Sequence, residues 1–131
     1  MEQMFRLKLK KKLFCFDLDG VICKNIEYKN SNLINYNKSK PIRPAVRAIN
    51  KLYDDGHTIV IYTARGMTRY NGNISLVKNK LNKITTNSLK SWKLKYHKLV
   101  FGKIPYDFII DDKSINYSPN WTKAILKKSN F

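Results

Sequence analysis

An apolar run that stops at two acidic residues constrains this chain more than any other feature. In residues 13–22, LFCFDLDGVI, the apolar residues are followed by Asp17, Asp19 and Gly20. This pattern is typical of a buried parallel strand, here expected at about residues 12–17, that carries carboxylates at its C-terminal end. Because side chains alternate along a strand, the two acids are expected on one side, about 6 to 7 Å apart. Two such carboxylates repel each other unless a cation neutralises them, and Mg²⁺ prefers oxygen ligands of this kind.

Three interpretations of this stretch are open. It can be an ordinary strand and turn, in which the aspartates only stabilise the turn. It can be a calcium loop, although Cys23, Lys24 and Asn25 stand where an EF-hand needs further acidic ligands. It can also carry a nucleophile for phosphate chemistry, and that interpretation requires matching groups at the ends of other strands.

The composition is that of one globular domain. The 131 residues suffice for a single domain with a hydrophobic core and are too few for two, so residues 1–131 are treated as one domain. No apolar run approaches the roughly 20 residues of a membrane span, and the basic start is a poor signal peptide. We therefore expect a cytoplasmic protein without a membrane partner. Cys15 and Cys23 show no metal-binding spacing and are expected to be reduced.

The charge is strongly positive, with 26 basic residues against 9 acidic ones and a formal net charge of +17. Such an excess raises nucleic acid as a partner. However, the excess is mostly lysine, is spread along the chain and accompanies many Asn, Ile and Tyr residues, as in proteins of AT-rich genomes. Arginine, which suits bidentate contacts to phosphate or guanine, is scarce. We favour a solvated basic surface and keep a nucleic-acid partner as the alternative.

The rest of the chain reads as strands alternating with helices. Residues 1–12 could form a short edge strand or remain frayed, and the polar residues 21–40 could form a small flap or hairpin over the site. Residues 45–55 predict a helix, and residues 58–62 predict a strand that ends at Thr63. Residues 73–83 predict a second helix, and Thr85 or Thr86 can cap a third segment. Strands are expected at 98–101 and 106–110, and a last helix at 121–128.

These elements predict an α/β protein with a doubly wound, open parallel sheet that carries helices on both faces and no cap domain. Ligands of such sheets bind beyond the carboxyl ends of the strands. That rule gathers a set of polar side chains in one crevice: Asp17, Asp19, Thr63, Lys103, Asp111 and Asp112. Acids for a divalent cation, with a hydroxyl and an ammonium group for phosphate oxygens, form a set suited to phosphoryl transfer.

The same residues, in the same order, resemble the four motifs of the haloacid dehalogenase superfamily of phosphohydrolases over residues 12–116. A narrower resemblance lies in residues 62–66 (YTARG), 96–103 (YHKLVFGK) and 108–116 (FIIDDKSIN). These segments look like small capless members that act in capsule or surface-polysaccharide biosynthesis. The resemblance implies a Mg²⁺-dependent phosphatase acting on a small phosphorylated substrate.

The resemblance also implies roles for single residues. Asp17 would be the nucleophile that forms an aspartyl-phosphate, and Asp19 the general acid and base. Mg²⁺ would be held by Asp17, the backbone carbonyl of Asp19 and Asp112, with Asp111 as a helper or alternative ligand. Thr63 and the backbone amide of Ala64 would bind a phosphoryl oxygen. Lys103 would balance the negative charge of the nucleophile and the phosphate.

Some assignments are open. Lys98 is a rival for the motif lysine, although Gly102 and Pro105 favour Lys103. Arg65 could bind an anionic part of the substrate or be solvated, and His97 is interpreted as structural. The lack of a cap predicts an open site, for which we hypothesise a homo-oligomer. The alternative functions are a polynucleotide 3′-phosphatase, a non-catalytic binding module with this fold, and phosphotransfer to a sugar or nucleoside acceptor.

Overall fold

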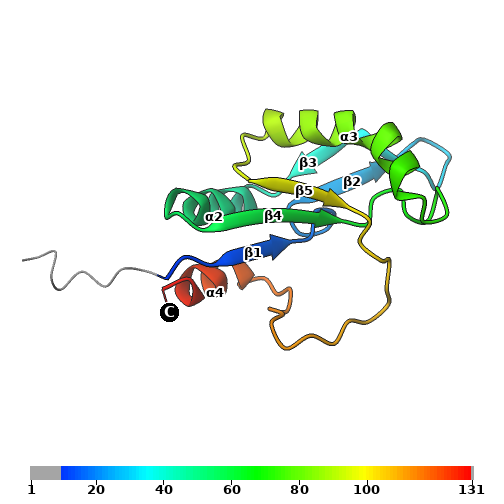
Figure 1. Cartoon of the computed structure of the whole chain (residues 1–131). Helices are drawn as coiled ribbons and strands as arrows, with labels where there is room; N and C mark the ends of the chain where they lie inside the picture. The colour runs from blue at the N-terminus through cyan, green and yellow to red at the C-terminus, as the bar shows by residue number, and fades with distance from the viewer. Residues whose placement is uncertain (1–9, 131) are drawn as a thin grey trace, which may run out of the picture.

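Three parallel strands form the framework of the computed structural model, which describes residues 10–130. They are β1 (Leu13–Phe16), β4 (Thr58–Thr63) and β5 (Lys98–Phe101), in the spatial order β1-β4-β5. Phe16 lies beside Ile61, and Thr63 lies beside Phe101, so all three strands end at the same edge of the sheet (Figure 1). The expected open parallel α/β sheet is confirmed, with the strands expected at 12–17, 58–62 and 98–101.

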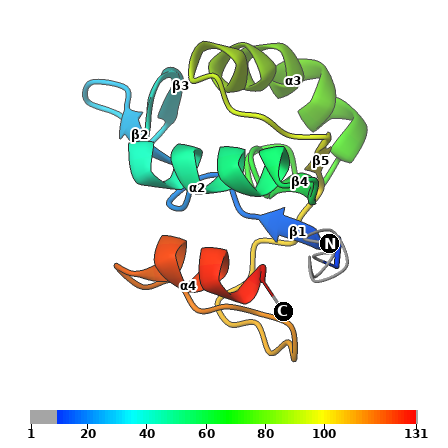
Figure 2. The ribbon, with the colours of Figure 1, turned by 90° about the vertical axis from the view of Figure 1, so that its left-hand side faces the viewer.

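Helices connect the strands and supply most of the core. Between the hairpin and β4 lies α2 (Arg43–Asp54), which has Pro44 in its first turn, a position where the missing N–H costs no hydrogen bond. Its apolar face packs toward the sheet, and α4 (Trp121–Lys128) lies on the same side of the sheet as α2 (Figure 2). The last connection, from β4 to β5, contains α3 (Ile74–Ser91).

The buried core lies on one face of the sheet. Phe16, Ile59 and Ile61 point to this face and pack with the apolar residues of α2, of the end of α3 and of α4. On the opposite face, Leu13 is 64% exposed and Cys15 is exposed. The sequence predicts helices on both faces, whereas in residues 10–130 the buried cluster is built on this single face.

The segment expected to be a flap is a β-hairpin. Its strands are β2 (Cys23–Glu27) and β3 (Ile34–Pro41), which pair antiparallel with a shift in register between Lys24 and Ile26. The hairpin packs against α3 through β3 and follows directly on the turn after β1 (Figure 1). It therefore forms one wall of the region around Asp19.

The middle of the chain differs from the expectation of two separate helical segments. The helix α3 is continuous from Ile74 to Ser91, and Asn73 caps its start by accepting a hydrogen bond from the backbone N–H of Leu76. The Thr86 hydroxyl donates back to the carbonyl of Asn82 within the helix, a contact that a helix interior tolerates. Because this hydroxyl is used inside α3, it does not cap a new segment.

The fourth strand, expected at 106–110, is not formed. Residues 102–120 run as an irregular segment between β5 and α4, and Phe108 and Ile110 are 92% and 101% exposed. An apolar, β-branched run favours a strand only where a neighbouring strand pairs with it, and this segment lies away from β1 (Figure 1). The edge strand considered for residues 1–12 falls mainly on residues outside the described range. Within residues 10–130, no helix is long and apolar enough to cross a membrane.

Candidate active site

The ends of the three parallel strands bring together residues that are far apart in the sequence. Asp17 follows β1 directly, Thr63 is the last residue of β4, and Lys103 stands two residues after β5. The Lys103 ammonium lies 3.4 Å from a carboxylate oxygen of Asp17, and its backbone N–H donates to the carbonyl of Thr63 at 3.2 Å. The predicted meeting of these residues at one edge of the sheet is therefore what the structure shows. Lys98, the rival lysine, is exposed at the opposite end of β5.

The ion pair at this edge is partly shielded from water. The side chain of Lys103 is 17% exposed and that of Asp17 is 36% exposed. Burial by itself would lower the pKa of Lys103, but the hydrogen bond and charge of Tyr106 and of Asp17 outweigh it and raise the pKa above its usual value. Lys103 thus remains a cation beside the Asp17 carboxylate at any pH near neutrality.

A tight turn after β1 places the second acid, Asp19, beside the hairpin. The Leu18 carbonyl accepts the backbone N–H groups of Val21, Ile22 and Cys23, and Gly20 has a φ of 88°. A residue with a Cβ adopts this left-handed conformation only with strain, so glycine suits the position. The turn carries Asp19 toward the hairpin rather than toward Lys103.

Asp19 is held by a buried arginine. The Arg65 guanidinium contacts both carboxylate oxygens, with Nε 3.1 Å from Oδ1 and 3.0 Å from Oδ2, and Nη2 2.9 Å from Oδ1. The side chain of Arg65 is 0% exposed and that of Asp19 is 28% exposed. Of the two interpretations of Arg65, the alternative of a solvated arginine is therefore wrong, because the guanidinium is enclosed between the hairpin and α3.

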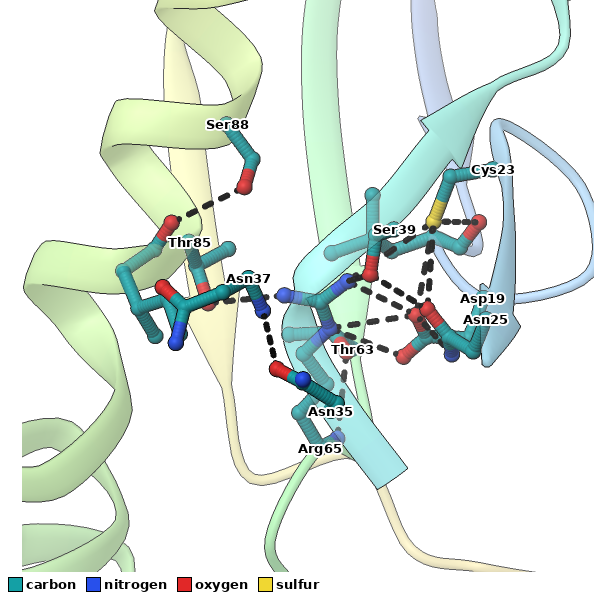
Figure 3. A network of polar contacts seen from close by, with 12 residues as sticks. Asp19, Cys23, Asn25, Asn35, Asn37, Ser39, Thr63, Arg65, Thr85 and Ser88 are labelled. Carbon is teal, nitrogen blue, oxygen red and sulfur yellow. Dashed lines mark hydrogen bonds and ion pairs between the residues drawn. The ribbon is translucent and has the colours of Figure 1, made fainter. Parts of the chain in front are cut away.

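The remaining donors of Arg65 are used by surrounding polar groups (Figure 3). Its Nη1 donates to the Thr85 hydroxyl of α3 at 3.1 Å, and its Nη2 lies 3.4 Å from the Ser39 hydroxyl. The Tyr36 ring stacks on it, with its centroid 4.2 Å from the guanidinium carbon. Asn25 completes the cluster by donating to Asp19 Oδ1 at 2.7 Å and accepting from Ser39 at 2.6 Å.

A buried thiol borders this cluster. The Cys23 sulfur lies 3.4 Å from Asp19 Oδ1 and 3.7 Å from Arg65 Nη2. Burial, together with the nearby Asp19 charge, raises the pKa of the Cys23 thiol to about 12. The thiol is therefore neutral near pH 7, and it acts as a weak donor to the carboxylate rather than as a nucleophile.

Sequence reasoning did not find the partners of Arg65. Asn25, Tyr36 and Ser39 lie in a polar, irregular stretch in which no period marks the residues that face inward. Thr85 carried a usable signal, because it stands four residues after Leu81 and four before Leu89, on the apolar stripe of α3. A polar residue on such a stripe is expected to have a buried partner.

The acidic pair at 111–112 does not join the site in this structure. Asp111 and Asp112 are exposed, and Asp111 is used locally, since its carboxylate accepts from the Lys113 N–H at 2.8 Å. Within residues 10–130, no three His, Cys, Asp or Glu residues are close enough to hold a metal ion. The expected set of magnesium ligands is thus not assembled, because the strand that would carry Asp112 beside Asp17 is not paired.

The structure also places two further residues named from the sequence, Ala64 and His97. Ala64 lies in the loop after β4, half-buried, and its carbonyl accepts from the Met67 N–H. His97 is structural, as interpreted: its Nδ1 accepts from the Ile59 N–H at 3.0 Å and its ring stacks on Tyr53.

The comparisons with known proteins support the fold. The chain is similar to the crystal structure of a structural-genomics target from Vibrio cholerae, with 25% sequence identity and a TM-score of 0.69. The match covers 91% of this chain and 98% of that one. The description of that protein names no activity. No protein-family model and no curated protein sequence matches the chain.

Proposed function

We propose that this chain is a phosphomonoester hydrolase that acts through an aspartyl-phosphate on Asp17. The observation that supports this proposal most directly is the meeting of Asp17 and Lys103, 3.4 Å apart, at the C-terminal edge of the sheet, beside the end of β4. A carboxylate at such an edge, next to a fixed cation and a buried threonine, suits attack on a phosphoryl group. The resemblance of the motif residues to haloacid dehalogenase phosphohydrolases points the same way.

In the proposed reaction, an oxygen of Asp17 attacks phosphorus, and the bond from phosphorus to the leaving oxygen breaks. Asp19, which enters the cycle protonated, gives its proton to that oxygen, so an alcohol leaves and an acyl phosphate remains on Asp17. Asp19 then takes a proton from water as the water oxygen attacks phosphorus. Inorganic phosphate leaves, and Asp17 and Asp19 return to their starting states.

Three other groups would stabilise charge during these steps. Lys103 would offset the negative charges of Asp17 and the incoming phosphate, which otherwise repel each other. The Thr63 hydroxyl and the Ala64 backbone amide would bind a phosphoryl oxygen. The Thr63 hydroxyl oxygen already accepts a hydrogen bond from the backbone N–H of Arg65 at 3.1 Å, so the hydroxyl proton remains available for donation.

Magnesium is part of the proposal, but the described arrangement does not fit it, since the acids are not gathered. When bound, Mg²⁺ would supply positive charge at the nucleophile and phosphate. A site requires residues 106–112 to approach β1, which among the described residues pairs only with β4. The exposure of Phe108 and Ile110 supports such a movement, because a strand added at this edge would remove apolar surface and an open strand edge from water.

A sugar phosphate or a related small metabolite of surface-polysaccharide biosynthesis is the substrate class that we propose. This choice rests on the resemblance of residues 62–66, 96–103 and 108–116 to small capless phosphatases. A 3′-phosphorylated polynucleotide is the second candidate, favoured by one observation, the formal net charge of +17. A polynucleotide would bind with a steep dependence on salt, which a small sugar phosphate would not show.

The test is phosphate release from sugar phosphates, nucleotides and a 3′-phosphorylated oligonucleotide, with Mg²⁺ or with EDTA. We expect metal-dependent turnover that Asp17→Asn abolishes. The matched control is Asp54→Asn, which removes an exposed carboxylate of α2 whose ion pair with Lys95 lies on the surface and contributes little.

The outcomes separate the candidates. Turnover of a sugar phosphate by wild type and Asp54→Asn, but not by Asp17→Asn, supports the proposal. Turnover confined to the oligonucleotide, falling steeply with salt, would favour the second candidate. Folded wild-type protein that releases no phosphate from any substrate would contradict both and leave a binding role.

A further inference from the structure

The two oxygens of Asp19 have unequal surroundings. Oδ1 receives four contacts, from Arg65 Nε and Nη2, from the Asn25 amide and from the Cys23 thiol. Oδ2 receives one among the described residues, from Arg65 Nε at 3.0 Å. The single Nε–H is shared between the two oxygens, so within the described part of the chain Oδ1 has three donors of its own and Oδ2 has none of its own. A further proton therefore finds a free lone pair on Oδ2 and not on Oδ1.

We propose that Arg65 is a positioning residue, which fixes the Asp19 carboxylate so that Oδ2 is the oxygen that exchanges protons with the substrate. This inference rests on the proposed function and adds a role that differs from substrate binding. Each nitrogen of the Arg65 guanidinium has an acceptor within the protein, namely Asp19, Thr85 or Ser39, without a substrate anion.

The support of Arg65 comes from two separate elements. Thr85 holds it from α3, while Ser39 and the Tyr36 ring hold it from β3 of the hairpin. A planar guanidinium with both edges engaged can place a carboxylate within a narrow range of orientations. The hairpin would therefore act on the chemistry through Arg65 and Asn25.

Leaving-group chemistry distinguishes this role from a general effect on folding. Cleavage of benzyl phosphate needs a proton on the departing oxygen, because benzyl alcohol is a weak acid. Cleavage of 4-nitrophenyl phosphate does not, because nitrophenolate leaves readily as an anion. The two substrates have similar size, and kcat/KM reports the step that forms the aspartyl-phosphate.

The experiment compares kcat/KM on both substrates for wild type, Arg65→Met and Arg65→Lys. General acid catalysis typically contributes about 10²-fold or more, so we expect Arg65→Met to lose about 10²-fold on benzyl phosphate and only a few-fold on 4-nitrophenyl phosphate. Arg65→Lys keeps the charge without the planar fork and should remain impaired on benzyl phosphate. Arg47→Met, which removes an exposed arginine of α2, is the matched control and should leave both values unchanged.

A second measurement does not depend on turnover. In ¹⁵N-labelled protein, the Nε proton of Arg65 should exchange slowly with water, and Asp19→Asn should accelerate that exchange while the backbone spectrum stays folded.

The outcomes separate this inference from the proposed function. A selective loss on benzyl phosphate together with a protected Nε proton supports the positioning role. An equal loss on both substrates, or full rescue by Arg65→Lys, would overturn it. A wild type that releases phosphate from neither of these two substrates nor from the sugar phosphates and the oligonucleotide would contradict the proposed function, and fast exchange of the Nε proton would overturn the Arg65 contact itself.

Discussion

Removing either partner of the Asp19 and Arg65 ion pair should reduce stability unequally. Asp19→Asn leaves a guanidinium whose side chain is 0% exposed without its carboxylate, whereas Arg65→Met leaves a carboxylate that is 28% exposed. Breaking a buried pair by removing one charge typically costs about 3 to 5 kcal/mol, and we expect Asp19→Asn near that range. Asp19 without Arg65 keeps water and the Asn25 amide as partners, so Arg65→Met should cost about 1 to 3 kcal/mol.

The double variant separates the pair from the two single losses. With both charges gone, neither is left buried alone, so the combined loss in free energy of unfolding should be smaller than the sum by about 1 kcal/mol or more. The assay is urea unfolding of the four proteins at neutral pH and at one salt concentration. Losses of this size are readily measured, because the free energy of unfolding of a domain is only about 5 to 15 kcal/mol.

Two results would contradict this prediction. If Arg65→Met costs as much as Asp19→Asn, the difference in burial does not control the effect. If the single losses add to within about 0.5 kcal/mol, the two side chains do not interact in solution as they do in the structure. The second result would also remove the basis for the positioning role of Arg65.

Three further predictions concern other parts of the chain. Burial lowers the pKa of His57 from 6.5, because the folded state disfavours the charged imidazole. The stability that neutral His57 contributes is therefore complete above about pH 6.5 and is lost as the pH falls below that value. His57→Asn should flatten this pH dependence of the free energy of unfolding, measured by urea unfolding. The native protein should be alkylated at exposed Cys15 and not at buried Cys23, whose pKa is raised to about 12, and mass spectrometry of a digest would refute this by finding Cys23 modified. If residues 106–110 pair with β1 when Mg²⁺ is added, their amide hydrogen exchange should slow in wild type and not in Asp112→Asn; no change in wild type would contradict the movement proposed for this segment.

Local patterns were sufficient to predict most of the framework. The apolar runs predicted parallel strands at 12–17, 58–62 and 98–101, and the rule that strand ends share one edge predicted the meeting of Asp17, Thr63 and Lys103. Such inferences succeed because a buried strand needs a continuous apolar run and a parallel pair needs a helical crossover.

The parts that sequence reasoning missed depend on contacts between distant segments. Residues 106–110 form a strand only if they pair with the edge of β1, and no local sequence pattern predicts that pairing. The burial of Arg65 depends on the hairpin and α3 closing around it, and residues such as Ser39 show no periodic signal that would reveal their inward direction. Thr85 is the exception, since a threonine on an apolar helix stripe predicts a buried polar partner.

The most direct test of the proposed function is to trap the covalent intermediate. Protein mixed with a turned-over phosphomonoester is treated with borohydride, which reduces an acyl phosphate to an alcohol, and the peptide that contains residue 17 is analysed by mass spectrometry. We expect homoserine at position 17, absent without substrate and absent in Asp17→Asn. Continued phosphate release with Asp17 unmodified under the same conditions would contradict it.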